Sequence, residues 1–317
     1  MEIVLNSALF TEEQKESLRP QIVQLITNLS TDLDLSTLDK VIIPKDFTKE
    51  VVTFQEDHNK QITGHTKNEN EEAKAKVMYY IEEGNYRQVV FLHEMFISGG
   101  MVDNIDVVKK CYFFIRHELG HVHDEFNKRE IYSDDLRQGI GLSHLDFTLT
   151  IHSDVVWSEY FANRTAGAHL TTELFVEQAS YTIELIYRVK EECTKYIKAY
   201  RKHADINLLM EQIKEATHML FYFTALTIGN MHYYKETLSE GEYNRIKEAV
   251  EGNITGTYFE ECWSLIEKAL TDLYSKYPNW NDILQLDELN QAIHKCWNEL
   301  GIYLEDHGEN MYINVPY

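Results

Sequence analysis

The sequence predicts an α+β protein that is mainly helical, with a small N-terminal sheet followed by a helical bundle. Three observations lead to this class. Short apolar runs bounded by charged or turn residues occupy part of the first hundred residues, as is typical of strands. From Thr171 onward, apolar residues instead recur three and four positions apart, which is the spacing of helices that bury one face. The chain has only four prolines, so we expect no long disordered linker.

The N-terminal half is predicted to begin with a helix and to continue with strands. Thr11 and Gln14 have the spacing of a capping box and open a helix that runs to about Leu29. A polar loop at residues 57–72 and a turn at Gly84 punctuate the segments that follow. These segments predict a sheet of three or four strands, at residues 41–43, 50–54, 76–81 and 88–92.

The C-terminal half is predicted to be helical throughout. Its most apolar stretch, residues 216–231, is too short to cross a bilayer and contains His218 and Asn230, so we expect a buried helix there. We expect two domains, 1–170 and 171–317, with the second packed on the first. The predicted helices cover residues 172–201, 205–234, 239–251, 256–276 and 282–305, and residues 312–317 form an extended tail.

The most informative motif is His117-Glu118-Leu119-Gly120-His121, an HExxH pattern on a helix predicted over residues 103–126. Residues four apart lie on one face of a helix, so both imidazoles can reach one metal ion. Glu118 can hold a water molecule and act as its general base. Gly120 costs a helix about 1 kcal/mol relative to Ala, which a close approach at a metal centre would explain. The alternative is a buried helix whose histidines are satisfied by hydrogen bonds.

A catalytic zinc ion usually has three protein ligands and leaves a fourth position for water. His123 is excluded because it lies about 200° around the helix from His121. The best third ligand is Glu159, on a helix that Ser153 or Asp154 can cap. An ordinary solvated glutamate is the alternative interpretation of Glu159.

Four further residues are candidates for supporting roles. Asn163 lies four positions after Glu159 on the same face, where it can hydrogen-bond a ligand histidine or the nearby chain. Tyr160, Arg164 and His152 are candidates for stabilising the oxyanion that forms when water attacks a carbonyl. For each of them an ordinary structural role is the alternative.

The HExxH motif, followed by Glu159-Tyr-Phe-Ala-Asn163-Arg, resembles the gluzincin class of zinc metallopeptidases. The pair H-E-x-G-H and E-x-x-A-N is similar to the ImmA/IrrE-like peptidases of bacteria and their mobile elements. The resemblance covers roughly residues 75–170. It implies a zincin-like catalytic domain with Zn²⁺ as cofactor, in which Glu118 is the catalytic base and the metal ligands are His117, His121 and Glu159. It also implies an edge strand, 76–81 or 88–92, that pairs with an extended substrate.

Composition limits the partners that we expect. A net charge of −22 disfavours binding to nucleic acid phosphates or anionic membranes, although its main effect is solubility. The four cysteines form no C-x-x-C pair, which indicates free thiols in a reducing cytoplasm. The N-terminus lacks the basic segment of an export signal.

We therefore expect a cytoplasmic zinc metallopeptidase, a hydrolase that cleaves peptide bonds of a peptide or protein, with no nucleic acid or membrane partner. The alternative is a non-proteolytic, metal-containing regulatory or protein-binding module, and a third interpretation is a metal-free scaffold. The sequence leaves the oligomeric state open.

Overall fold

A computed structural model of the chain describes residues 1–58, 74–132, 139, 141–308 and 310–316. The chain is mainly helical and carries a small mixed sheet, as predicted. It divides into two units, which are described separately. The sheet unit comprises Met1–Phe126 and Thr165–Thr171, and the helical unit comprises Asn127–Arg164 and Thr172–Tyr317. Most of the predicted polar loop, residues 59–73, lies outside the described residues.

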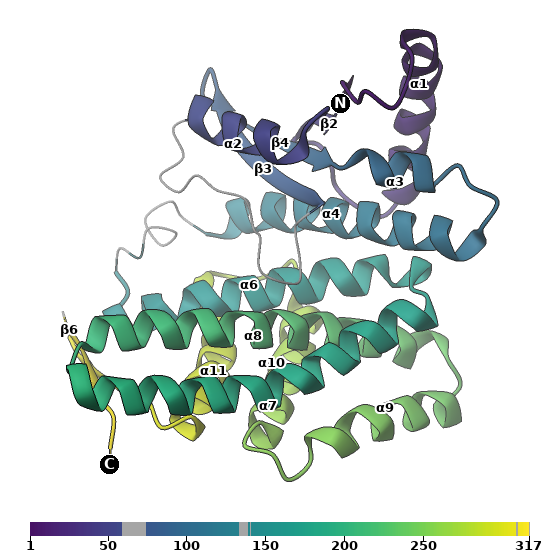
Figure 1. The fold of residues 1–317 in the computed structure, drawn as a ribbon. Coiled ribbons are helices and arrows are strands. Elements are labelled where there is room, and N and C mark those ends of the chain that lie inside the picture. Colours follow the sequence, from purple (N-terminus) through teal and green to yellow (C-terminus); the bar gives the residue numbers. More distant parts are fainter. Residues whose placement is uncertain (59–73, 133–138, 140, 309, 317) are drawn as a thin grey trace. The chain divides into compact units, whose positions relative to one another are not determined.

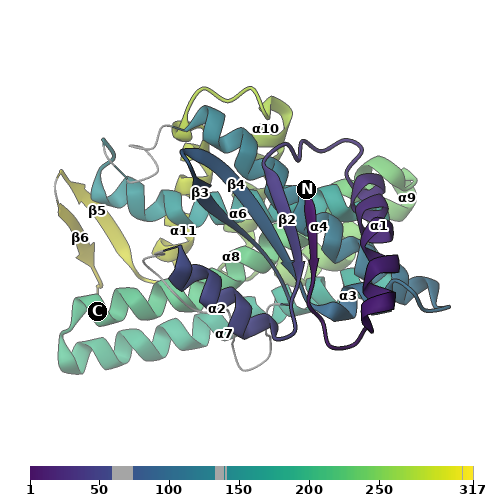
Figure 2. The same ribbon diagram turned by 90° about the horizontal axis from the view of Figure 1, so that it is seen from above.

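The sheet has four strands, in the order β1-β2-β4-β3 (Figure 2). The first three run parallel, and β3 pairs antiparallel with β4. Glu82 pairs with Asn85 across a two-residue turn in which Glu83 and Gly84 have φ of +50° and +81°. This left-handed turn confirms the predicted hairpin. The strands are β1 (Glu2–Leu5), β2 (Leu38–Ile43), β3 (Ala75–Glu82) and β4 (Asn85–Leu92).

Helices cover both faces of the sheet in the sheet unit (Figure 1). Helix α1 (Glu12–Leu29) begins with the predicted capping box of Thr11 and Gln14. Together with α3 (Glu94–Gly99) and α4 (Ile105–Ile131), it buries apolar side chains against one face. The side chains of this core include Ile22, Ile26, Val41, Val90, Leu92, Ile115, Leu119 and Val122. The sequence predicted neither β1 nor α3.

The other face packs against α2 (Phe47–Asp57), where the predicted strand at residues 50–54 is wrong. The β-branched run resembles a strand, but Asp46 caps a helix by accepting a hydrogen bond from the backbone N of Lys49 at 3.0 Å. Buried side chains then recur every four residues, at Phe47, Val51 and Gln55. That spacing is helical, and it outweighs the local preference for a strand.

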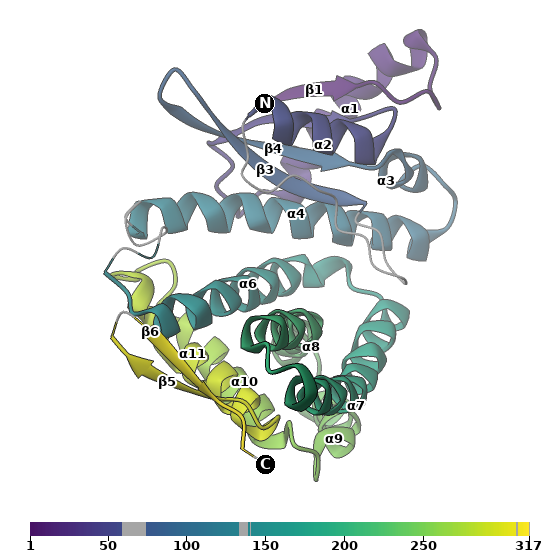
Figure 3. The same cartoon turned by 60° about the vertical axis from the view of Figure 1, so that its left-hand side comes forward.

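The helical unit consists of long helices and a terminal hairpin (Figure 3). Helix α8 lies at its centre, as Figure 3 shows, and residues 223–232 of α8 are all buried. This confirms the buried helix predicted around residues 216–231. None of the helices within the described residues has the length and apolar character required to cross a membrane. The helices are α6 (His144–Ala166), α7 (Thr172–His203), α8 (Ile206–Thr237), α9 (Glu240–Ile254), α10 (Glu260–Lys276) and α11 (Asp287–Glu299).

Two predicted boundaries in this unit are wrong. Helix α6 begins at His144 rather than after a cap at Ser153 or Asp154; both residues lie inside the helix, where Ser153 is fully buried. The cap is Ser143, whose Oγ accepts from the backbone N of Asp146 at 3.1 Å. The helix predicted to residue 305 ends before Gly301, whose φ is +91°. A hairpin of β5 (Tyr303–His307) and β6 (Asn310–Asn314) replaces its end and part of the extended tail.

Candidate metal centre

Helix α4 presents two imidazoles on one face. The Nε2 atoms of His117 and His121 are 3.0 Å apart, and their ring planes are nearly perpendicular, at 86°. His117 is buried, with its ring stacked on that of Phe113. His123 lies on another face, as predicted, where its Nδ1 accepts from the backbone N of Asp34 at 2.8 Å. The four-residue spacing therefore directs the two imidazoles toward a common point.

Helix α4 is fixed in place by its apolar side and by one arginine. Ile115 and Leu119, on its other side, are fully buried in the core of the sheet unit. Arg116 donates from Nη2 to both carboxylate oxygens of Asp32 at 2.8 Å, and from Nε to the carbonyl of Thr165 at 2.7 Å. Asp32 and Thr165 both belong to the sheet unit, so Arg116 fixes α4 within that unit.

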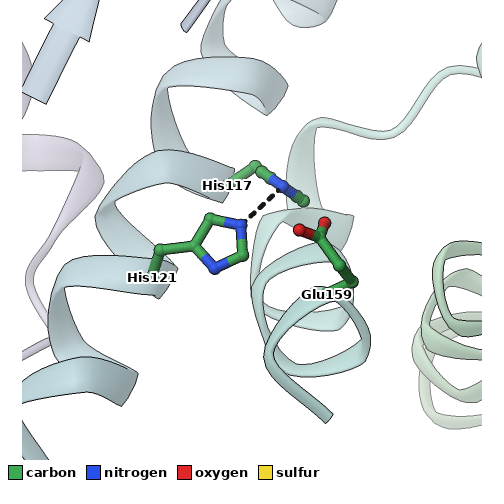
Figure 4. A group of neighbouring side chains, drawn as sticks. All are labelled: His117, His121 and Glu159. Atoms are coloured by element: carbon green, nitrogen blue, oxygen red, sulfur yellow. Dashed lines mark hydrogen bonds between the residues drawn. The ribbon is translucent and has the colours of Figure 1, made fainter. Parts of the chain in front are cut away.

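Glu159 is the third member of the group. One ligand atom each from His117, His121 and Glu159 can be chosen so that all three lie within 4.8 Å of one another. Figure 4 shows the carboxylate of Glu159 pointing toward the two imidazoles. The structure thus brings together the three residues that the sequence predicted as ligands. Glu118 is partly buried on α4, directly after His117.

The donor set fits a zinc ion. Two nitrogens that each bind zinc at about 2.0–2.1 Å in tetrahedral geometry lie about 3.3–3.4 Å apart, close to the observed 3.0 Å. Two imidazoles and one carboxylate are a common ligand set of catalytic zinc and leave one position for water. Structural zinc sites instead use four protein ligands, frequently thiolates. The four cysteines are all free and buried, and none belongs to this group.

The residues after Glu159 make their hydrogen bonds within the helical unit. The hydroxyl of Tyr160 lies 2.8 Å from Nδ1 of His232 and accepts a hydrogen bond from Arg164, which also pairs with Glu236. Burial raises the pKa of Tyr160 well above its usual range. Tyr160 and Arg164 therefore support the helix that carries Glu159. Their direct part in stabilising an oxyanion stays a prediction.

Asn163 and His152 also have their contacts in the helical unit. The amide of Asn163 donates to the carbonyl of Leu226 at 2.8 Å. His152 packs edge-on against Trp297 and Phe221. Burial lowers the pKa of His152 to about 4, with smaller contributions from the positive charges of His218 and Lys214. His152 is therefore neutral at pH 7, and its role at the transition state stays a prediction.

Sequence reasoning missed a partly buried series of polar contacts that begins at Tyr160. Nε2 of His232 lies 3.7 Å from Glu267, whose carboxylate also pairs with Lys247 at 3.1 Å. The contact with His232 is the largest influence that lowers the pKa of Glu267. His232 and Tyr160 are 72 residues apart in the chain, so no local spacing could have indicated their contact. These contacts join α6 to α8 and α10, beginning at the residue that follows Glu159.

Gly229 of α8 sets the distance to α6 beside the ligand. A Cβ atom on Gly229 would lie 2.8 Å from the carbonyl oxygen of Tyr160 and 3.2 Å from the backbone N of Arg164. We expect Gly229→Ala to reduce the free energy of unfolding by about 1–3 kcal/mol, because backbone atoms cannot easily move away. Denaturant unfolding measures the change.

The matched control for this prediction is Gly252→Ala on α9, where an added Cβ meets nothing within 4 Å. That change is expected to be neutral or to stabilise the protein by about 0.5–1 kcal/mol, since alanine favours a helix. Equal effects of the two substitutions would show that the close approach at Gly229 has no energetic importance.

Comparison of the chain with models of protein families, with curated proteins and with solved structures finds no match in any of the three. The interpretation of the site therefore depends on the residues themselves and on their geometry.

Proposed function

We propose that the protein is a zinc-dependent hydrolase of peptide bonds, with the zincin-like arrangement that the two motifs resemble. The single observation that carries the proposal is the convergence of His117, His121 and Glu159, with one ligand atom of each within 4.8 Å of the others. Glu118 adjoins the first of these ligands on the same helix. A purely structural histidine pair would not require a carboxylate from a second helix to converge on it.

The proposed chemistry divides between the ion and the chain. A zinc ion in this site would polarise the scissile carbonyl and lower the pKa of a water molecule to near 7. Glu118 accepts the proton of the attacking water and later delivers it to the leaving amine. The two imidazoles and the carboxylate of Glu159 would hold the ion. Arg116 holds α4 within the sheet unit, and the contacts from Tyr160 to Glu267 hold α6 within the helical unit.

Strand β3 supports a peptide as the substrate class. Of the two strands predicted as the substrate-pairing edge, β4 lies inside the sheet, whereas β3 is the last strand in the order of the described sheet. The outer edge of such a strand offers backbone donors and acceptors to an extended peptide, which can join the sheet as a further strand. This leaves β3 as the proposed pairing edge.

The proposed setting is the cytoplasm, acting on a peptide or protein substrate. Free, buried cysteines are expected in a reducing compartment. The strongly negative net charge argues against nucleic acid or an anionic membrane as the partner.

The proposal is tested by metal analysis together with a digest. We expect about one zinc per purified chain and cleavage of a synthetic peptide library, detected by mass spectrometry. A chelator should abolish cleavage, and added zinc should restore it. One equivalent of zinc with no cleavage of any peptide would instead favour the non-proteolytic regulatory or protein-binding module. Protein that binds no metal would favour the metal-free scaffold.

A further inference from the structure

Three amide side chains meet in the interior of the helical unit. Asn163 lies on α6, Gln178 on α7 and Asn230 on α8, and they are 1%, 7% and 0% exposed. Nδ2 of Asn230 donates to Oε1 of Gln178 at 2.6 Å, and Nδ2 of Asn163 donates to the same oxygen at a longer 3.4 Å. Gln178 therefore holds the amides of two other helices. We call these three residues the amide cluster.

The contacts of Asn163 bring α6 against α8 at a defined rotation. Its Nδ2 carries two hydrogens and has two acceptors, the carbonyl of Leu226 at 2.8 Å and the side chain of Gln178. The two helices can approach here because α8 has a glycine: a Cβ atom on Gly229 would lie only 3.4 Å from Cβ of Asn163. Asn230, which follows Gly229 directly, is the other donor to Gln178. Together these contacts fix the rotation of α6 about its own axis.

Stability alone does not explain the amide cluster. A buried amide loses its hydrogen bonds with water, and replacing hydrogen-bonded partners together by apolar side chains of similar shape can be neutral or stabilising. What a hydrogen bond adds is direction, because a donor must face its acceptor, whereas apolar side chains can slide past one another. The amide cluster is therefore suited to fixing the orientation of the helices that meet there.

One of these helices carries Glu159. Asn163 follows Glu159 by four residues on α6, so the two side chains leave the helix on the same side. A side-chain tip lies about 5–6 Å from the helix axis, so a rotation of about 10° would move the carboxylate by about 1 Å. Bonds to a metal ion tolerate deviations of only about 0.2 Å. The rotation of α6 therefore sets how well the carboxylate of Glu159 is placed to bind an ion.

We propose that Gln178 is a positioning residue for the proposed metal ligand Glu159. Through Asn163 it fixes the rotation of α6, and through Asn230 it ties that rotation to α8. The inference rests on the proposed function, because it concerns the zinc site of the proposed hydrolase. It adds a residue that neither the HExxH motif nor the segment around Glu159 contains.

The test compares variants of the whole chain that remove polar contacts from the same core. Gln178→Met keeps the length of the side chain and removes its amide, whereas Gln178→Glu keeps an oxygen that can accept from Asn163 and Asn230. The matched control is Thr182→Val. Thr182 lies one turn later on α7, is 1% exposed, and joins α7 to α8 through the hydroxyl of Thr227 at 2.8 Å.

Three measurements are made on each protein. Competition with a chromophoric chelator gives the zinc affinity. The visible spectrum of the cobalt-substituted protein reports the geometry of the ligands around the ion. Denaturant unfolding of the metal-free protein gives the effect of each substitution on stability, so that a loss of stability is not mistaken for a loss of positioning.

We expect Gln178→Met to weaken zinc binding by about tenfold, the lower end of the range for residues that orient metal ligands. The cobalt spectrum should change as well. Gln178→Glu should recover most of the affinity, because it restores the acceptor. Thr182→Val should leave both the affinity and the spectrum unchanged, even if it lowers stability as much as Gln178→Met does.

A second variant tests whether Gln178 acts through Asn163. Asn163→Leu should weaken zinc binding too, and adding Gln178→Met to it should weaken the binding little further. Fully additive losses would overturn the proposal, because the two residues would then act independently. If Gln178→Met does not fold, Asn163→Leu still decides the question, since unchanged zinc affinity in that variant overturns the proposal.

Failure of the inference and failure of the proposed function give different results. Zinc binding and peptide cleavage that are unchanged in Gln178→Met overturn the positioning role and leave the peptidase standing. The role is also overturned if Thr182→Val weakens zinc binding equally, since any loosening of the core would then have the same effect. Zinc binding that depends on Gln178, without cleavage of any peptide, supports the positioning role and overturns the peptidase. An unchanged protein that binds no zinc overturns both.

Discussion

Glu118→Gln is expected to bind zinc as the unchanged protein does and to lose at least about a hundredfold in kcat. The amide has nearly the same shape as the carboxylate, so the helix and the neighbouring imidazoles should keep their positions. It cannot accept a proton from water, however, and this is the step that the proposed mechanism assigns to Glu118. The expected loss is in the chemical step, so KM should change little.

The control for this variant is Glu130→Gln, which removes one exposed carboxylate near the end of the same helix. Its kcat and zinc content should equal those of the unchanged protein. Metal content is measured on each preparation before the kinetics, so that loss of zinc is not mistaken for loss of the base. A Glu118→Gln protein with full zinc and full activity would exclude Glu118 as the base. A protein that also loses its zinc would show that Glu118 has a structural role.

The candidate metal ligands could be predicted from the sequence because two of the three lie within one turn of a single helix. The spacing of His117 and His121 is set by the geometry of one helix, and nothing distant can alter which face they share. Glu159 was found because a second helix with a carboxylate was required to complete the ligand set. The sequence predicts a cap at Ser153 or Asp154, since serine and aspartate are favoured caps in isolation. In the folded protein Ser153 is fully buried in a helix that already began at His144.

The incorrect predictions share a physical origin, which is that contacts made only in the folded protein outweigh local sequence preference. The first turns of α6 bury Thr148 and Thr150 as well as Leu149, so the apolar spacing that signals a helix is lost. At α2, a short run of β-branched residues suggests a strand. In the fold, the cap at Asp46 and the burial of Val51 favour a helix instead. Both errors are cases in which tertiary contacts outweigh local preference.

Contacts between segments that are distant in the chain could not be predicted from the sequence alone. The partners of Tyr160 and Asn163 are His232 and Leu226, more than sixty positions later in the chain. The sequence also could not show which of the two predicted edge strands lies at the edge of the sheet. In the fold, β4 pairs with both β2 and β3, so β3 is the edge strand.

His152 leads to the second large effect, on stability in acid. Its pKa in the folded protein is lowered to about 4, whereas a histidine in the unfolded chain titrates near 6.5. Between these values the unfolded state binds more protons than the folded state, so stability falls as the pH is lowered from 6.5 to 4. The neutral, buried ring should therefore contribute about 3 kcal/mol at pH 7 that is lost by pH 4.

The substitution that isolates this contribution is His152→Phe, which keeps an aromatic ring against Trp297 and Phe221 and removes the titrating group. Denaturant unfolding at pH 7 and at pH 4.5 gives the acid-dependent loss for each protein. We expect the variant to lose about 2–3 kcal/mol less than the unchanged protein over this interval. His307→Asn removes an exposed histidine of β5 and should leave the loss as it was.

The unchanged protein and His152→Phe must be compared with each other because other groups also titrate between pH 7 and pH 4.5. Carboxylates that are ionised in the fold, such as Glu267 with its lowered pKa, contribute stability that is lost as the pH falls through their folded pKa. These contributions are common to the unchanged protein and to His152→Phe, so the difference between the two losses belongs to residue 152. If the two proteins lose equal stability on acidification, His152 is protonated in the fold as readily as in the unfolded chain. The ring would then have access to water, contrary to its burial between α8 and α11.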